Sequence, residues 1–248
     1  MIRGVIFDLG STLMYFDGNW EDVIARGSAA LAHNLREKGI RVNDRFGAEF
    51  IETRRVGRER SARTDVEYTA TQALRETLAH QGYPNVSDEI IAQALEVFFA
   101  PEEAHCALYT DARATLEQLR VRGLRVGLIS NATDDGFVQR NVQRLGLSEL
   151  LTPTISSAAV PWRKPDPRIF KYVLTEWNLD AEQVVMVGDW PETDVLGAHR
   201  AGMRAILLDR NLPQPPHLDK EIPDAHLLEA DATVCDLAAV LSAIENLN

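Results

Sequence analysis

The chain has 248 residues, of which 45% are hydrophobic and 25% are charged, a balance typical of a soluble globular protein. Its 37 acidic residues outnumber the 26 basic ones, and the formal net charge of −11 disfavours nucleic acid and anionic membranes as partners. No run approaches the roughly 20 apolar residues of a membrane span. The apolar run that ends at Asp8 is too short for a secretory signal. We therefore expect a cytoplasmic protein.

The two cysteines, Cys106 and Cys235, match no metal-binding or redox spacing. They could form one disulfide, but a reducing cytosol favours free thiols. Since free cysteine behaves as a small apolar residue, we expect both to be buried.

Short apolar runs rich in β-branched residues recur along the chain and predict buried strands. They lie at residues 5–7, 125–130, 152–156, 184–187 and 205–208, with a weaker sixth at 232–235. Amphipathic segments predict helices at residues 112–122, 134–145, 167–177 and 194–201. Continuous apolar strands that alternate with helices predict an α/β fold with a parallel, Rossmann-like sheet.

The stretch from residue 15 to residue 105 interrupts this alternation. It contains no convincing strand and predicts four helices, at residues 20–38, 45–60, 65–80 and 89–99. A helical block after the first strand is the pattern of an insertion. We therefore predict an α/β core of residues 1–14 and 106–248, an all-helical inserted cap of residues 15–105, and a hinge at 14–16 and 101–106. A Pro-rich stretch at residues 212–216 predicts a stiff surface loop.

Polar residues follow most of the predicted strands. They are Asp8, Gly10 and Thr12 after the first strand, Ser130 and Asn131 after the second, Lys164 in the loop after the third, and Asp189 and Asp194 after the fourth. Ligands of open parallel sheets bind outside the carboxyl ends of the strands. We therefore expect three carboxylates, a hydroxyl and a lysine to converge at one edge of the sheet.

These groups suit phosphoryl transfer. A carboxylate attacks phosphorus effectively once the phosphoryl charge is neutralised. Clustered carboxylate and carbonyl oxygens, with no thiol or imidazole among them, suit Mg²⁺. Lys164 would add positive charge at the phosphoryl oxygens, and Ser130 would donate a hydrogen bond to them.

Four motifs resemble those of the haloacid dehalogenase (HAD) superfamily. They are Asp8-x-Gly10-x-Thr12, the hydrophobic run that ends in Ser130-Asn131, Lys164-Pro165-Asp166-Pro167, and Gly188-Asp189-x4-Asp194. Each motif is weak alone, but all four occur in order, each after a predicted strand. The likeness covers about residues 4–208, and the position of the insertion resembles the C1-capped subgroup.

The resemblance implies a role for each motif residue. Asp8 is expected to be the nucleophile and a Mg²⁺ ligand, with the backbone carbonyl of Gly10 and the carboxylate of Asp189 as further ligands. Asp194 is expected to be a ligand or to orient one. The residues expected to bind the phosphoryl group are Thr12, Ser130, Asn131 and Lys164.

Position 10 departs from the family pattern, because the phosphatases usually have a second Asp there as general acid and base. Gly10 has no side chain for proton transfer, and such a loss typically costs about 10²–10⁴ in rate. Three explanations remain open: slow catalysis, a leaving group that needs little protonation, such as an acyl phosphate or a sugar 1-phosphate, or an acid supplied by the cap. Candidates for that acid are His33, His80 and His105.

The predicted cap also contains an arginine-rich segment, formed by Arg54, Arg55, Arg58, Arg60 and Arg63. The favoured interpretation is a solvated helix face that pairs with neighbouring acidic residues. The alternative is that one or two of these arginines enter the site and hold an anionic group of the substrate.

Together these observations predict a Mg²⁺-dependent phosphohydrolase that acts on a small phosphorylated metabolite through an aspartyl-phosphate on Asp8. Two alternatives stay open. A 2-haloacid dehalogenase would use the same nucleophile without metal, but Asp189 and Asp194 would then repel the haloacid carboxylate. A HAD-like module that binds phosphate or a partner protein without turnover would explain Gly10. The sequence does not specify the substrate or the oligomeric state.

Overall fold

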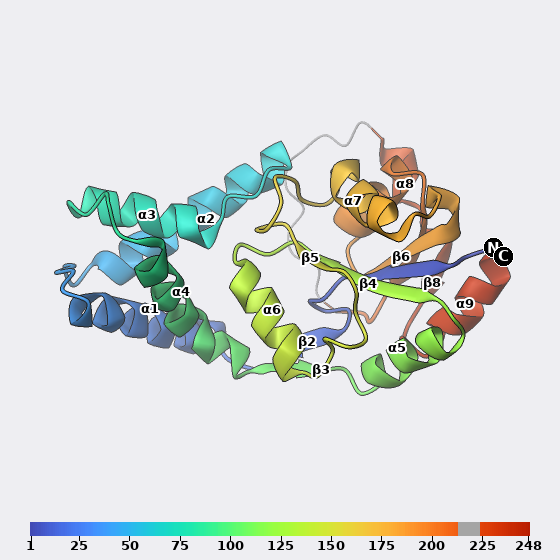
Figure 1. Ribbon diagram of the computed structural model, residues 1–248, viewed down its shortest axis with the longest axis horizontal. Helices are drawn as coiled ribbons and strands as arrows, with labels where there is room; N and C mark the ends of the chain where they lie inside the picture. The colour runs from blue at the N-terminus through green and yellow to red at the C-terminus, as the bar shows by residue number, and fades with distance from the viewer. Residues whose placement is uncertain (213–223) are drawn as a thin grey trace.

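A six-stranded sheet forms the right half of the computed structural model in Figure 1. The structure describes residues 1–212 and 224–248. Across the sheet the strands are β5 (Thr154–Ser156), β4 (Arg125–Ser130), β1 (Gly4–Phe7), β6 (Val184–Gly188), β7 (Arg204–Leu208) and β8 (Ala232–Val234). Neighbouring strands run parallel. This confirms the predicted α/β class and its parallel, Rossmann-like sheet.

The central strands bury both of their faces. In β1, Val5 and Phe7 belong to one hydrophobic cluster and Ile6 to another, because side chains alternate across a sheet. The first cluster is covered by α5 (Ala112–Val121), α6 (Asp135–Arg144) and α9 (Val240–Leu247). The second is covered by α7 (Pro167–Trp177) and α8 (Leu196–Arg200). The two helical layers lie below and above the strands in Figure 1.

Two core elements differ by two or more residues from their predicted bounds, and several others differ by one. Strand β5, predicted to begin at residue 152, begins at Thr154, because Pro153 has no N–H to donate to a neighbouring strand. The helix predicted at 194–201 begins earlier, with a π-helical turn, η2 (Pro191–Val195), that leads into α8. Single turns of 3₁₀-helix, η1 (Ala181–Gln183) and η3 (Ala225–Leu228), precede β6 and β8.

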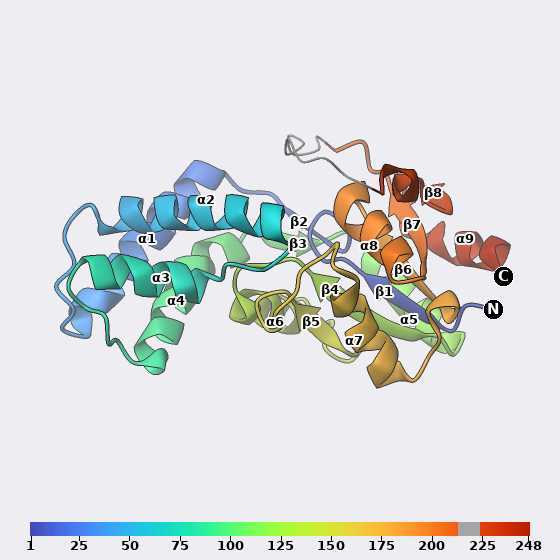
Figure 2. The same ribbon diagram turned by 90° about the horizontal axis from the view of Figure 1, so that it is seen from above.

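Four helices form the left half of Figure 1: α1 (Trp20–Glu37), α2 (Phe46–Thr64), α3 (Ala70–His80) and α4 (Asp88–Glu103). They share a hydrophobic cluster of their own, which includes Leu31, Phe50, Leu74 and Phe98. Both chain termini lie at the opposite end of the molecule (Figure 2). We propose, as the sequence predicts, that these helices form a cap domain on the α/β core.

Local capping residues set the boundaries of these helices. Some of these boundaries differ from the predicted ones. Asp65 adopts a left-handed conformation, with φ of 53°, and ends α2 later than predicted. Thr69 then begins α3 with a reciprocal capping box to Gln72, so the predicted start of this helix at residue 65 is wrong. Helix α4, predicted to end at residue 99, continues through Pro101 to Glu103.

Two short strands join the helical region to the sheet. β2 (Met14–Phe16) and β3 (Cys106–Leu108) pair antiparallel. β2 coincides with the first predicted hinge segment, whereas β3 shares only Cys106 with the second, residues 101–106, of which 101–103 belong to the end of α4. The prediction that residues 15–105 are all-helical is therefore wrong at its beginning, where Tyr15 and Phe16 are in a strand. Three-residue strands show too little periodicity to be recognised in a sequence.

Other sequence predictions have mixed outcomes. Both cysteines are free, as predicted; Cys106 is buried, but Cys235 is exposed, so the expectation of burial is wrong for that residue. Among the described helices, none has both the length and the apolar character that crossing a membrane would require. Of the predicted Pro-rich loop, residues 213–216 lie outside the described residues.

Gly27 provides a test of how α1 packs against α4. A Cβ at this position would lie 2.3 Å from the backbone oxygen of Phe98. We expect Gly27→Ala to lower the free energy of unfolding by about 1–3 kcal/mol through overpacking, despite the higher helix propensity of alanine. Urea unfolding followed by circular dichroism measures this. Ala29→Ser, at an exposed position of α1, is the control, and an equal or higher stability of Gly27→Ala would contradict the described packing.

Candidate active site

Three strands bring polar residues to one edge of the sheet, where they line a cavity of about 670 Å³. Asp8 follows β1, Ser130 ends β4, and Asp189 follows β6. After β1 the sheet continues with β4 and β5 on one side, and the chain then crosses back to β6 on the other side of β1, so the strand order reverses here and this edge is the topological switch point of the sheet. The opposite wall of the cavity comes from α1, α2 and α4, and includes Trp20 and Arg54.

Lys164 connects two of the carboxylates. Its Nζ donates to Asp8 Oδ1 and to Asp194 Oδ1, both at 2.6 Å, and its side chain is 1% exposed. Burial lowers the pKa of Lys164, but the carboxylates of Asp194 and Asp8 outweigh this effect and raise it above its ordinary value. The ammonium is therefore charged in the folded protein. A buried charge of this kind is stable only when it is paired and hydrogen-bonded, as it is here.

Asp194 is held on both of its oxygens. Oδ1 accepts from Lys164, and Oδ2 accepts from the backbone N–H of Trp190 at 3.0 Å. A Cβ on Gly188 would lie 2.3 Å from Asp194 Cγ, so only glycine lets the carboxyl approach the end of β6 this closely. The geometry fits an orienting role for Asp194, the second of the two roles expected from the sequence.

Asn131 holds the backbone of Lys164 in place. Its Nδ2 donates to Lys164 O at 2.8 Å, and its Oδ1 accepts from Lys164 N at 2.9 Å. This reciprocal pair joins the loop after β4 to the loop that carries the lysine. The amide is thus engaged with protein groups, and Asn131 fits a positioning role better than the predicted contact with phosphate.

Thr12 and Ser130 lie at different places relative to the cavity. Thr12 is fully buried, does not line the cavity, and donates from Oγ1 to Asp189 Oδ1 at 3.3 Å. Its position fits the orientation of Asp189 rather than the predicted direct contact with phosphate. Ser130, in contrast, lines the cavity beside Asp8 and Lys164, where the sequence places a phosphate-binding hydroxyl.

The site has more carboxyl groups than positively charged groups to balance them. Burial raises the pKa of Asp8 to about 6; Asp194 adds to this effect, and Lys164 opposes it. Burial also raises the pKa of Asp189 to about 7, and the carboxylates of Asp8 and Asp194 contribute. One ammonium therefore does not compensate three neighbouring acids.

The oxygen donors at this edge fit Mg²⁺, which prefers hard oxygen ligands. Asp8, Gly10 and Asp189 line the same cavity, and a divalent cation would supply the charge that the two carboxylates lack. Within residues 1–212 and 224–248, no three acidic, imidazole or thiol side chains gather into a metal centre. A Mg²⁺ site would therefore consist of two carboxylates and a backbone carbonyl.

Gly10 leaves open space on the cavity wall. A Cβ at this position would meet no atom within 4 Å. Close packing therefore does not require glycine here, and a longer side chain would extend into the cavity. The missing proton-transfer group is a feature of the sequence and is not imposed by the fold.

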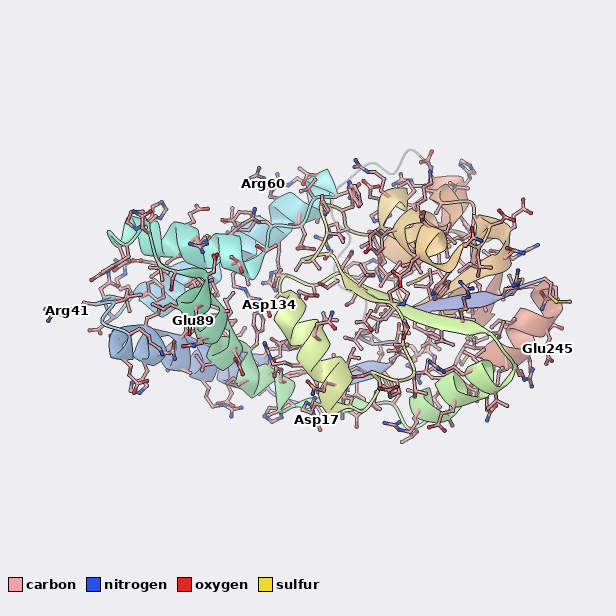
Figure 3. All side chains as sticks on the ribbon, viewed as in Figure 1. Asp17, Arg41, Arg60, Glu89, Asp134 and Glu245 are labelled. Carbon is pink, nitrogen blue, oxygen red and sulfur yellow. The ribbon has the colours of Figure 1, made fainter. Side chains whose placement is uncertain are left out.

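The arginine-rich segment of α2 divides into two sets. Arg55 forms ion pairs with Glu52 and Glu59, as the solvated-face interpretation predicts. Arg54 and Arg58 line the cavity, although Arg58 is also exposed to solvent, so the alternative that these arginines hold an anionic group of the substrate stays a prediction for both. Arg60 lies at the exposed surface near the end of α2 (Figure 3).

The candidate histidines His33, His80 and His105 do not line the cavity. His105 instead contacts Arg26 and Asp17 beside β3. The cavity does contain two carboxyls that the sequence analysis missed. Glu102 lies near the end of α4, and Asp134 caps α6 at its end nearest the helical region (Figure 3). Neither belongs to a motif that would distinguish it from the other acids of the chain.

A family model described as haloacid dehalogenase-like hydrolase matches residues 2–202. The chain therefore belongs to the haloacid dehalogenase-like hydrolase family, as its four motifs predicted. The family is one of hydrolases, and several curated relatives that the chain resembles are named phosphatases.

Three curated phosphatases illustrate this similarity. A phosphoserine phosphatase of Thermus thermophilus is 33% identical over 64% of this chain and 62% of its own length. A phosphoglycolate phosphatase of Rhodospirillum rubrum is 29% identical over 87% and 83%. A glyceraldehyde 3-phosphate phosphatase of Methanothermobacter thermautotrophicus is 26% identical over 92% and 96%. The match to the first of these spans less than two thirds of that protein.

Solved structures support the fold. A 2-haloacid dehalogenase from Pseudomonas syringae superposes over 100% of both chains, with a TM-score of 0.69 and 26% identity. A HAD phosphatase from Thermococcus onnurineus covers 98% of both chains, with a TM-score of 0.60 and 21% identity. The second likeness concerns the fold alone.

The raised pKa values of Asp8 and Asp189 predict how stability depends on pH. Because the folded state binds protons more tightly at these carboxyls, the stability present at low pH is lost as the pH rises through about 6 to 7. We expect the free energy of unfolding of the metal-free protein to fall between about pH 5 and about pH 7.5. Mg²⁺ should restore stability at the higher pH by binding the folded state.

Urea titrations at both pH values measure this effect. Asp189→Asn removes one of the two groups, so the decline should become smaller. Asp44→Asn, at an exposed position, is the matched control and should leave the decline unchanged. An equally steep decline in Asp189→Asn would show that this carboxyl is not the source.

Proposed function

We propose that the chain is a Mg²⁺-dependent phosphohydrolase that acts on a small phosphorylated metabolite, with Asp8 as its nucleophile. The observation that supports this most is the buried Lys164, whose Nζ lies 2.6 Å from both Asp8 and Asp194 at the edge of the cavity. This ammonium keeps the attacking carboxylate ionised and places positive charge where a phosphoryl group would bind. The names of the curated relatives agree with this reaction.

In this proposal, one oxygen of Asp8 attacks phosphorus and forms an aspartyl-phosphate as the leaving group departs. Ser130 and Lys164 donate hydrogen bonds to the phosphoryl oxygens. Asp194 and Asn131 keep Lys164 in place, through its ammonium and its backbone respectively. Water then hydrolyses the acyl-phosphate and restores the carboxylate.

Asp8, Asp189 and the carbonyl of Gly10 would hold Mg²⁺. The cation, when bound, neutralises charge between the anionic nucleophile and the anionic substrate. Thr12 would orient Asp189 towards it through the hydrogen bond to Oδ1. This ligand set contains no thiol or imidazole, as a hard cation prefers.

The absence of a carboxyl at Gly10 restricts the substrates that can react quickly. We expect good leaving groups, such as those of acyl phosphates and sugar 1-phosphates, to react faster than alkyl phosphates. A cytoplasmic location forms part of the proposal, since Cys106 and Cys235 are free thiols.

A second candidate function is dehalogenation of a 2-haloacid, which the similarity to the Pseudomonas syringae enzyme favours. It would use Asp8 as nucleophile on carbon and would need no cation. Two further carboxyls, Asp189 and Asp194, argue against it, because they would repel a haloacid carboxylate. Release of chloride from 2-chloropropionate in the presence of a metal chelator would establish this activity.

The nucleophile is tested by Asp8→Asn. We expect Mg²⁺-dependent hydrolysis of p-nitrophenyl phosphate and acetyl phosphate, and a loss of at least about 10³-fold in kcat for the variant, because the amide cannot form the covalent intermediate. Removal of Mg²⁺ with a chelator should abolish turnover. Asp44→Asn is the control for purity and handling. Parent-level turnover of Asp8→Asn would refute the assignment, and tight phosphate binding without any turnover would favour a binding module.

The account of Gly10 is tested by Gly10→Asp. Because the site has room for the side chain, we expect the variant to fold and to hydrolyse alkyl phosphates about 10²-fold faster than the parent. Gly10→Asn, which has the same size but cannot transfer the proton, is the control and should show no gain. A Gly10→Asp protein that folds and binds Mg²⁺ without any gain would contradict this account.

A further inference from the structure

Arg54 is a half-buried cation in the wall of the active-site cavity. Its guanidinium lies over three phenyl rings, at 4.8 Å from the ring centre of Phe98, 5.0 Å from Phe99 and 5.7 Å from Phe50. Stacking of this kind fixes the plane of the guanidinium and restricts its rotamers. Arg54 is therefore held rigidly, unlike the exposed Arg55 one position along α2.

This cation lacks a full set of protein partners. Its Nη2 donates to Thr133 Oγ1 at 3.3 Å, while its Nε is buried and has no hydrogen-bond partner within the described chain. The acids that face it are Glu102 and Asp134, and neither forms an ion pair with it in residues 1–212 and 224–248. The guanidinium thus places a positive charge on the cavity wall that no described carboxylate pairs directly, and an anionic group of a bound molecule would pair it there.

The charges around Arg54 favour a singly charged anion. Arg58, at the exposed rim of the cavity, adds positive charge, but Glu102 and Asp134 oppose it. Burial raises the pKa of Glu102 to about 7, so this acid is only partly ionised at neutral pH. A carboxylate would meet less repulsion here than a phosphate dianion, and its two oxygens match the planar donors of a guanidinium.

The position of Arg54 limits the length of the ligand. Thr133, which Arg54 contacts, lies three residues after Ser130, so their Cα atoms are at most about 11 Å apart. A compound that contacts both Ser130 and Arg54 therefore spans only this short loop and the side chains at its ends, which suits a small metabolite.

We propose that the substrate carries a carboxylate in addition to the transferred phosphate, and that Arg54 binds this carboxylate. The inference deepens the proposed function and rests on it, because Ser130 and Lys164 are taken to bind the phosphate end. The substrate class is then that of short-chain phosphorylated carboxylic acids.

The experiment compares two ligands that differ only in the group at the end opposite the phosphonate. The phosphonate analogues of 3-phosphoglycerate and glycerol 3-phosphate cannot be hydrolysed, and they carry a carboxylate and a hydroxymethyl group respectively. Calorimetric titration with Mg²⁺ present should show that the acid binds at least about tenfold more tightly, as a charge-assisted hydrogen-bonded pair implies. A bisphosphonate with a three-carbon chain is the third ligand.

Arg54→Met keeps the apolar contact with the phenyl rings and removes the charge. We expect the dissociation constant of the acid to rise about 10- to 100-fold, and that of the neutral analogue to change less than about threefold. The unchanged affinity for the neutral analogue also shows that the variant is folded. Arg55→Met is the matched control and should leave both constants unchanged.

The outcomes separate this inference from the proposed function. Equal affinity of the parent protein for the two analogues would overturn the inference, as would an unaltered preference in Arg54→Met. Tighter binding of the bisphosphonate than of the acid would overturn the assignment to a carboxylate. Loss of the preference in Arg54→Met, in a protein that hydrolyses no phosphate ester, would support the inference and contradict the proposed function instead.

Discussion

The buried ammonium of Lys164 is the interaction on which the site depends. It bridges Asp8, which follows the first strand, and Asp194, which lies within the π-helical turn after β6. Parts of the chain far apart in sequence are thereby joined at one point. Because a charge in such a place is stable only with good partners, the backbone around it is also specified: Asn131 holds the lysine, and Gly188 admits the carboxyl.

The same network leaves an excess of negative charge at the mouth of the sheet. Lys164 compensates part of it, and Asp8 and Asp189 retain pKa values above those of ordinary carboxyls. This imbalance suits an enzyme that binds a cation and an anion together. The excess negative charge attracts the cation to the site even before the substrate binds. Stability of the empty protein and affinity for the cation are in this sense opposed.

Much of this arrangement was predictable from the sequence. Continuous apolar strands identified the parallel sheet, and the order of four short motifs identified the edge where Asp8, Lys164 and Asp189 lie together. The roles of Thr12 and Asn131 were not predictable in the same way, because a motif shows that a residue is near the site but not which partner its side chain contacts. Arg54 and Arg55 show the limit most clearly: both are arginines of one helix, and only the packing of α2 against α4 places one in the cavity and the other in solvent.

The paired strands β2 and β3 have a mechanical consequence. Both crossings between the sheet and the helical region pass through one hydrogen-bonded ribbon, so they cannot bend independently. If the helices form the proposed cap domain, its motion would reduce to a rotation about this ribbon, and a side chain on the far wall would travel along an arc. The guanidinium on α2 would then sweep towards or away from the catalytic edge as the lid turns, and the length of the bound molecule would set the angle at which it stops.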